Sequence, residues 1–352
     1  PMARRTKTGK PLVAERRYDA QPAERAARAL KKRAPRKRAA PRKRGLVGWM
    51  LFPLTWTLRL IFRLTWKLGL VVAVLIGAGA LYFSAQMPPI ESIVDARTRG
   101  SVTLLDRDGA VFAWRGDQFG GMVTAESVSP YLHDAIVATE DKRFYGHFGI
   151  SPRGVASAVR INLSEGRGPL SGNGGSTITQ QVAKLLCLGV PYDAATWPTE
   201  AAYEDDCRRT TILRKAKEAI YSMGMEVAYS KEDILTIYFN RAYLGAGSRG
   251  FEAAANRYFG KSSAQVNPAE AAMLAGLLKA PTSYAPTNNM QRAVDRANIV
   301  LGLMEDQGYI TPEQAADARA HPAQLSQAAQ ARAGGYFADW VMEQGPDFFT
   351  RN

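Results

Sequence analysis

The chain is poor in the residues that build metal centres. Its 352 residues include two cysteines, Cys187 and Cys207, and three scattered histidines, His133, His147 and His321. No Cys/His spacing is typical of a zinc site, so a structural metal cluster is not expected. No internal repeat is visible, and the length is sufficient for one large or two small domains with a proper core.

Surplus basic charge is missing from most of the chain. Residues 1–44 contain 17 Lys or Arg and three acidic residues, whereas the remainder contains 29 of each sign. The net charge of +14 therefore belongs to one tail, and the globular part has no overall basic field. The tail has almost no apolar residues and cannot bury enough surface to become ordered. We predict a disordered basic tail over residues 1–45 and no nucleic-acid partner.

Residues 46–86 are apolar by contrast. Their first half mixes aromatic residues with arginine, which suggests a helix at a membrane interface. Leu68–Phe83 then contains no charge, and extension to Leu64–Ala85, with Lys67 reaching toward the interface, gives 22 residues. A cleaved signal peptide is the alternative, but about 45 residues of charged tail precede the stretch. We predict a single uncleaved transmembrane helix, with the tail in the cytoplasm by the positive-inside rule.

The rest of the chain has a short β signal followed by helical patterns. Within residues 87–126, the runs Ser101–Leu105 and Val111–Trp114 flank an Asp-Arg-Asp-Gly turn, which predicts a β-hairpin in a linker. Apolar residues then recur three and four apart, as in helices. The pattern predicts a mainly α domain over residues 127–300 and a helical linker over residues 301–352.

The first stretch with candidate chemistry runs from Glu140 to Gly149, after an apolar helical segment. On a continuous helix, Glu140 and Phe144 lie four residues apart on one face, with Arg143 beside them. A carboxylate beside aromatic surface is desolvated, which raises its pKa toward the range useful for proton transfer. Glu140 is therefore a candidate general base, although a solvated helix charge would give the same pattern.

A second stretch opens a helix after two glycines. Ser176 or Thr177 is the expected N-cap, and Gln180 and Lys184 would then share a face. A capped helix start with a lysine suits an anionic or sugar ligand. A well-capped surface helix explains the same residues equally well.

A third stretch, Arg214-Lys215-Ala216-Lys217-Glu218, sets a carboxylate among cations. One interpretation is an ordinary salt-bridged helix face. The other is a site in which Glu218 stays ionised while the cations bind phosphate. Glu140 and Glu218 would then have separated pKa values, as an acid/base pair requires.

In this order the stretches resemble the motifs of the peptidoglycan glycosyltransferases, the family-51 domain of class A penicillin-binding proteins. The likeness covers about Ser101 to Pro286. It rests on the motifs Glu140-Asp141-x-x-Phe144-x-x-His147-x-Gly149, Gly175-Ser176-Thr177-Ile178-Thr179-Gln180-Gln181, Arg214-Lys215-x-x-Glu218, Lys231–Asn240 and Glu270–Gly276.

The resemblance implies a lysozyme-like, mainly α domain with a small jaw that dips into the membrane. It implies polymerisation of lipid II, with inversion at MurNAc C1 and release of undecaprenyl pyrophosphate. Glu140 would be the general base. Glu218 would organise the cations, or a divalent metal such as Mg²⁺ or Mn²⁺, that stabilise the pyrophosphate. The substrate-binding residues carried over by position are Asp141, Arg143, Phe144, His147, Ser176, Thr177, Gln180, Gln181, Lys184, Arg209, Arg214, Lys215, Lys217 and Asn240.

The resemblance also implies a location and partners. We expect an anchor in the bacterial inner membrane and a catalytic domain on its outer, periplasmic side. The expected partners are lipid II, the growing glycan strand, the bilayer and the cell-wall synthesis proteins of the divisome or elongasome. No organic cofactor is expected, and moenomycin, a mimic of the family's donor, should inhibit.

The chain departs from the family pattern in several places. Leu185 stands where the family usually has Asn, and either Arg209 or Arg208 could serve as the family's arginine, with the spacing off by about one. Leu188–Asp206 replaces a much shorter connection and is flanked by Cys187 and Cys207. These cysteines are either two buried thiols or a disulfide, which would contribute roughly 3 kcal/mol in an oxidising compartment.

Residues 334–341 resemble the linker that leads into a transpeptidase domain. No S-x-x-K motif occurs in the sequence, so penicillin binding is not expected of this chain. Two other functions remain open. A lysozyme-like muramidase or lytic transglycosylase needs one acidic Glu but has no use for the cations around Glu218. A non-catalytic membrane scaffold explains the basic tail but does not require Glu140, Lys184 and Glu218 together.

Overall fold

The computed structural model describes residues 52–94, 102–105, 107–109, 111–115, 118–169, 175–209 and 211–330. The predictions for the basic tail and for the chain after residue 330 lie outside these residues. The chain divides into two units, residues 1–68 and 69–352, and the helix α3 crosses the boundary between them. Each unit is described by itself.

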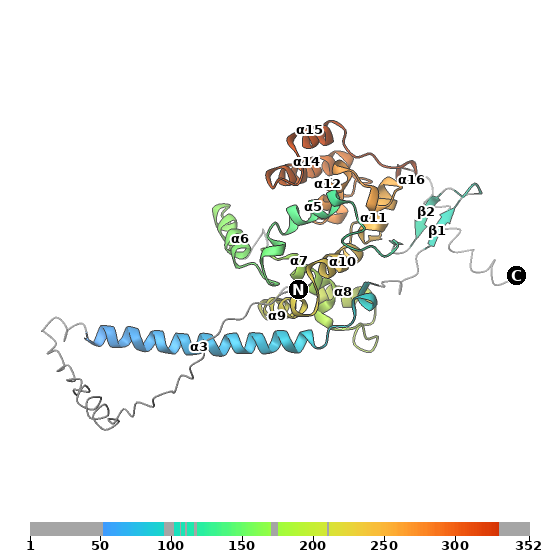
Figure 1. Ribbon diagram of the computed structural model, residues 1–352. Helices are drawn as coiled ribbons and strands as arrows, with labels where there is room; N and C mark the ends of the chain where they lie inside the picture. Colours follow the sequence, from blue (N-terminus) through green and yellow to red (C-terminus); the bar gives the residue numbers. More distant parts are fainter. Residues whose placement is uncertain are drawn as a thin grey trace, which may run out of the picture. The chain divides into compact units, whose positions relative to one another are not determined.

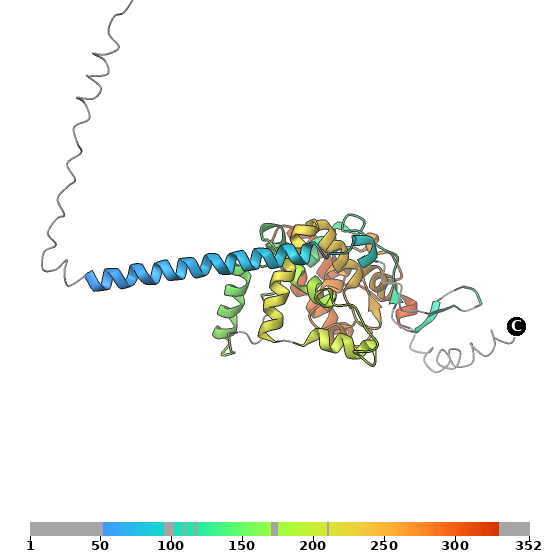
Figure 2. The same cartoon turned by 90° about the horizontal axis from the view of Figure 1, so that it is seen from below.

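Helix α3 (Phe52–Ser84) contains the apolar stretch. It is continuous over 33 residues, so the predicted interfacial and spanning segments form one helix (Figure 2). Its part Thr55–Ser84 is long and apolar enough to cross a membrane, and it is the one such helix in the described part of the chain. At about 1.5 Å per residue, this part exceeds the roughly 30 Å of a bilayer core.

The end of α3 lies within the second unit and packs closely on α9 (Ile212–Ala228). A Cβ added at Gly224 would lie 2.8 Å from the carbonyl oxygen of Ala80, so only glycine permits this approach. The rings of Phe83 and Tyr221 lie beside this contact, with centroids 5.2 Å apart. The apolar helix is thereby joined directly to a helix that carries candidate site residues.

The predicted β-hairpin is confirmed. β1 (Val102–Leu105) pairs antiparallel with β2 (Val111–Arg115), with Thr103 opposite Trp114. A second, parallel pair joins β3 (Gln118–Phe119) to β4 (Ser248–Arg249), which the sequence did not predict. Such a pairing joins segments far apart in the chain and leaves little local signal.

The rest of the structure is mainly α, as predicted (Figure 1). One group of helices packs α5 (Pro130–Glu140) against α12 (Pro268–Leu277) and α14 (Met290–Asp306), and every residue of α12 from Ala269 on is buried. A second group packs α7 (Ile178–Leu185) against α9 and α10 (Lys231–Arg241). The remaining helices are α4 (Ile90–Val94), η1 (Phe144–Gly146), α6 (Pro152–Ser164), η2 (Cys187–Gly189), α8 (Glu200–Arg208), α11 (Phe251–Phe259), η3 (Ser263–Gln265), α13 (Pro281–Tyr284), α15 (Pro312–Ala320) and α16 (Gln327–Gln330).

Helix starts are fixed by local chemistry. Capping boxes begin α7, α10, α12 and α15 at Thr177, Ser230, Asn267 and Thr311. In each, the cap side chain and the side chain three residues later satisfy backbone N–H groups that the helix leaves free. These starts also determine which side chains of α7 and α10 face the site.

Candidate active site

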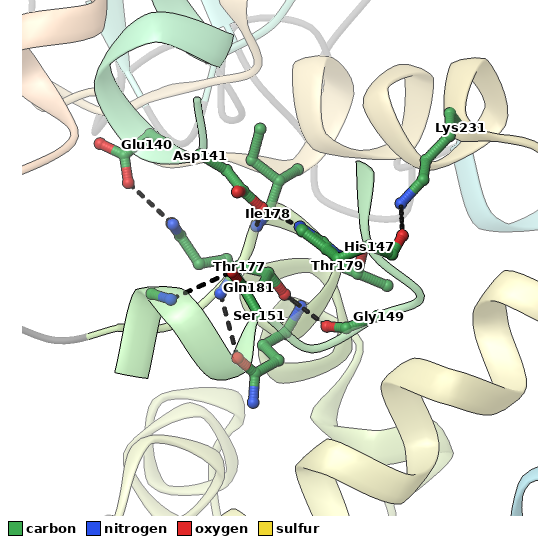
Figure 3. Close-up of polar contacts among 12 residues, drawn as sticks. Glu140, Asp141, His147, Gly149, Ser151, Thr177, Ile178, Thr179, Gln181 and Lys231 are labelled. Atoms are coloured by element: carbon green, nitrogen blue, oxygen red, sulfur yellow. Dashed lines mark hydrogen bonds and ion pairs between the residues drawn. The ribbon is translucent and has the colours of Figure 1, made fainter. Parts of the chain in front are cut away.

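Glu140 is the last residue of α5, and its half-buried carboxylate faces α7. Gln181 donates from Nε2 to Glu140 Oε2 at 2.7 Å (Figure 3). Burial raises the pKa of Glu140, while the bond from Gln181 and the charge of Arg296 oppose this rise. The direction predicted for a general base is therefore present.

Desolvation is the predicted cause of this rise, but the predicted helix face shared by Glu140 and Phe144 is wrong, because α5 ends at Glu140. Asp141 leaves the helical conformation with φ −159° and ψ 75°. Its Oδ2 accepts from the backbone N–H of Ile178 at 3.2 Å and from His147 Nε2 at 2.8 Å (Figure 3). These bonds to the start of α7 turn the chain away from α5, so Glu140 and Phe144 do not share a helix face.

Phe144 and Arg143 take other positions. Phe144 is fully buried in the core, with the Lys231 ammonium 4.4 Å from its ring centroid. Arg143 is half-buried, and its Nε has no hydrogen-bond partner among the described residues. Phe144 therefore anchors the turn after Glu140 in the core. Asp141, which also contacts His147, ties this turn to α7.

Thr177 is the N-cap of α7, as the sequence allowed. Its hydroxyl donates to the carbonyl of Gly149 at 2.6 Å and accepts from the Gln180 N–H at 3.1 Å. Gln180 Oε1 accepts in return from the Thr177 N–H at 3.0 Å. Both side chains are buried, so they hold the helix start in place.

Gln181, rather than Gln180, reaches the candidate base. Its Oε1 accepts from the hydroxyl of Tyr238 at 2.9 Å while its Nε2 donates to Glu140. Tyr238 lies on α10, is 1% exposed, and was not selected from the sequence. Its place inside the Lys231–Asn240 motif was the available signal, because a buried tyrosine hydroxyl usually has a polar partner.

The candidate cations lie along α7, from Ser176 just before its start to Lys184 in its last turn, and at the start of α9. The Lys215 ammonium bonds to Ser176 Oγ at 2.8 Å and to the Glu218 carboxylate, which is 4% exposed. Lys184 remains accessible, yet partial desolvation lowers the pKa of its ammonium. Glu218 opposes this shift, and Lys215, Arg214 and Arg208 add to it. Of the predicted cluster, Lys184, Arg214, Lys215 and Glu218 are thus brought together, whereas these contacts do not include Lys217.

Arg214 and Lys217 also line a cavity of about 320 Å³ beside the inserted segment Leu188–Asp206, called the insertion below. Arg214 Nη1 donates to the carbonyl of Asp206 at 3.0 Å, and its Nη2 has no hydrogen-bond partner among the described residues. Arg209 is exposed and lies 3.5 Å from the Asp206 carboxylate. Trp197 and Tyr203 contribute the aromatic lining of the cavity.

The insertion is closed by a Cys187–Cys207 disulfide, so the alternative of two free thiols does not apply. The cysteine Cα atoms are 5.2 Å apart. The insertion also contains helix α8, which begins at the cap Thr199 and was missed because residues 188–206 show no helical period. The disulfide joins the end of α7 to the last turn of α8.

Asn240 has a different environment from the other selected residues. Its Nδ2 donates to the carbonyls of Val123 at 2.6 Å and Thr236 at 2.7 Å, and its Oδ1 accepts from the Val123 N–H at 3.1 Å. Both amide hydrogens are therefore used within the protein. Asn240 ties the segment before α5 to α10, and its predicted role in substrate binding has no support from these contacts.

The geometry thus places one desolvated carboxylate, held by an amide of α7, near a cationic cluster formed by α7 and the start of α9. A family model described as Transglycosylase matches residues 108–305, which include α5, α7, α9 and α10. This chain belongs to the Transglycosylase family. The resemblance to the glycosyltransferase domain of penicillin-binding proteins is confirmed.

Several curated relatives of this Transglycosylase chain are penicillin-binding proteins. It is 35% identical over 249 residues to penicillin-binding protein 1A of Escherichia coli, covering 69% of this chain and 27% of the relative. For penicillin-binding protein 1A of Aquifex aeolicus the identity is 36% over 280 residues, covering 78% and 35%. For penicillin-binding protein 1A/1B of Bacillus subtilis it is 32% over 300 residues, covering 84% and 29%. The Transglycosylase chain thus spans about a third or less of these relatives.

Proposed function

We propose that this chain is a membrane-anchored peptidoglycan glycosyltransferase that polymerises lipid II into glycan strands. The observation that carries the proposal is the pairing of Glu140, whose pKa is raised, with the cations Lys184 of α7 and Arg214 and Lys215 of α9. Glycosyl transfer from a pyrophosphate donor needs both a base and a region that stabilises departing negative charge.

Glu140 takes the proton of the acceptor 4-hydroxyl. Because its Oε2 accepts from Gln181, its Oε1 is left to receive this proton. The acceptor oxygen forms a bond to MurNAc C1 of the growing chain as the bond from C1 to the pyrophosphate oxygen breaks, so the configuration at C1 inverts. The proton on Glu140 is then lost to water. A raised pKa makes the carboxylate a stronger base near neutral pH.

The leaving group is undecaprenyl pyrophosphate, and the cations stabilise it. Lys184 and Arg214 present positive charge, and Glu218 holds the Lys215 ammonium beside Ser176. Charge that is fixed before the reaction stabilises the transition state without reorganisation. The guanidinium of Arg214 is held by the Asp206 carbonyl, so its positive charge is fixed in place beside Lys215.

A divalent cation, Mg²⁺ or Mn²⁺, remains part of the proposal for the substrate-loaded state only. The described residues contain no group of three or more His, Cys, Asp or Glu placed to hold a metal. Glu218 would supply one carboxylate, with phosphate oxygens and water as the other ligands, as Mg²⁺ often accepts. Its chemistry would be charge neutralisation, and the protein cations perform this role in the scheme above.

The membrane supplies the substrate lipid. Helix α3 serves as the anchor, with the N-terminus in the cytoplasm and the catalytic domain periplasmic, in the inner membrane of a bacterium. Exposed Ile212 and Leu213 at the start of α9, at 81% and 84%, and Leu163 on α6 support an apolar jaw that dips into the bilayer. Cell-wall synthesis proteins of the divisome or elongasome are the proposed protein partners.

The deciding experiment compares this protein with Glu140→Gln in polymerisation of labelled lipid II in liposomes, with moenomycin as a parallel arm. We expect polymer from the parent, block by moenomycin, and a loss of about 10²- to 10⁴-fold in Glu140→Gln, the usual contribution of a general base. Glu126→Gln, an exposed carboxylate outside the site, is the matched control. Digestion of preformed glycan instead of polymerisation would support the muramidase alternative.

A further inference from the structure

A line of two hydrogen bonds runs from the protein core to Glu140. Tyr238 on α10 donates to Gln181 Oε1 at 2.9 Å, and Gln181 Nε2 donates to Glu140 Oε2 at 2.7 Å. Three elements, α10, α7 and α5, each supply one member. The scheme for Glu140 does not use Tyr238, which lies within the Lys231–Asn240 motif but was not selected from the sequence.

Only one direction of donation fits these three groups. An ionised Glu140 accepts hydrogen bonds and cannot donate, so Gln181 must turn its NH₂ group toward it. The amide oxygen of Gln181 then faces Tyr238, whose hydroxyl must donate. Burial raises the pKa of Tyr238 well above its ordinary value, so the hydroxyl keeps the proton that this arrangement needs.

We propose that Tyr238 is a positioning residue for the base, because it fixes the orientation of the Gln181 amide and thereby holds Glu140 with Oε1 open to the acceptor hydroxyl. The proposal rests on the proposed function, in which Glu140 is the general base. Without the tyrosine hydroxyl, the Gln181 oxygen loses its buried donor and the amide is free to rotate. A rotated amide would present oxygen to the carboxylate and favour its protonated form.

The loss of this hydroxyl should therefore change the pH dependence of the reaction. A hydrogen bond from Gln181 stabilises ionised Glu140, so weakening it raises the pKa of the base. The acid limb of the kcat profile should move to higher pH. The other charged groups that affect Glu140, Arg296 of α14 and the adjacent Asp141, are unchanged by the substitution. Substrate contacts are also unchanged, so KM should stay the same.

The test is Tyr238→Phe, measured as kcat and KM for lipid II across pH. We expect kcat near neutral pH to fall about three- to tenfold, the usual effect of one hydrogen bond, with the acid limb shifted upward. Tyr258→Phe is the matched control, since Tyr258 is fully buried and its hydroxyl donates to the Leu244 carbonyl at 2.9 Å. A fall in kcat without a shifted limb, or an equal shift in the control, overturns the proposal.

The variant Gln181→Leu provides a second test of the proposal. Its side chain cannot donate to Glu140, so it should shift the limb by at least as much, and adding Tyr238→Phe should shift it no further. A further shift in the double variant would overturn the proposal that Tyr238 acts through Gln181. If Tyr238→Phe does not fold, an unmoved limb in Gln181→Leu overturns it as well. Full activity of Glu140→Gln, by contrast, would remove the proposed function itself.

Discussion

The two ends of α7 differ in how they hold their polar groups. At its start, Asp141, Thr177 and Gln180 are buried and bonded to partners within the protein. At its end, Lys184 is exposed, and partial desolvation together with the nearby cations lowers the pKa of its ammonium. The first region fixes one carboxylate in one place, and the second supplies a field of positive charge.

This difference corresponds to two physical requirements. Proton transfer needs a base within hydrogen-bond distance of one hydroxyl, so a displacement of about 1 Å costs a large part of the rate. Stabilisation of a pyrophosphate needs positive charge within a few ångströms, and several arrangements of cations provide it. We therefore expect the start of α7 to be sensitive to geometry and its end to be sensitive to charge.

Conservative substitutions should separate the two regions most strongly. Lys184→Arg keeps the charge and should retain most activity, whereas Lys184→Ala should lose on the order of 100-fold. Glu140→Asp keeps the charge but shortens the side chain, so it should lose most activity. Lipid II polymerisation at two salt concentrations measures both, with exposed Lys279→Ala as the control. Equal tolerance of Lys184→Arg and Glu140→Asp would contradict the distinction.

The disulfide should affect only the cationic end. Closure of a loop with a separation of 20 residues contributes about 3 kcal/mol, so Cys187→Ser/Cys207→Ser should lower the free energy of unfolding by about this amount. Arg214 would lose a fixed carbonyl at Asp206, which should raise KM a few-fold. Chemical denaturation and steady-state kinetics with and without reductant measure these effects. A shifted acid limb in this variant would show that the two ends are coupled.

The smallest expected effect is a gain in stability when the general base Glu140 is replaced by Gln. Burial raises the folded-state pKa of Glu140, so the folded protein holds this proton more tightly than the unfolded chain. Its contribution to stability is full below the ordinary glutamate pKa and is lost as pH rises through the raised value. Glu140→Gln has no such charge to bury, so its melting temperature should exceed that of the parent near neutral pH. The difference should shrink toward pH 4, and a constant difference would contradict this origin.

Local patterns were sufficient to predict much of this molecule. The apolar helix, the β-hairpin, the mainly α domain and the Thr177 cap all depend on residues close together in the chain. The identity of the family followed from ordered motifs. The roles of Gln180 and Gln181 were harder to predict, because each depends on the partner that the side chain contacts.

The wrong and missing predictions share one physical cause: contacts with distant parts of the chain decided the structure at these positions. Helix α5 ends at Glu140 because Asp141 bonds to the backbone of Ile178, 37 residues later. Tyr238 acquires its partner Gln181 across 57 residues. Helix α8 forms in a segment without a helical period, where the Thr199 cap and the Cys207 disulfide hold its ends. Neither periodicity nor composition reports such partners.

The disulfide that closes the insertion bears on which changes of sequence this protein can accept. The chain leaves and returns at Cα positions 5.2 Å apart, and the segment between Cys187 and Cys207 is held a second time by Glu204, which accepts from Arg249 Nη2 at 2.9 Å. Residues 193–196 of this segment form an exposed turn away from both attachments. Exposed turns of this kind accept foreign sequence with little disturbance to their host. An epitope, a fluorophore-binding peptide or a shorter turn grafted at residues 193–196 should leave the helices intact. The Asp206 carbonyl that faces Arg214 and the Glu204 carboxylate that faces Arg249 would have to be kept in place.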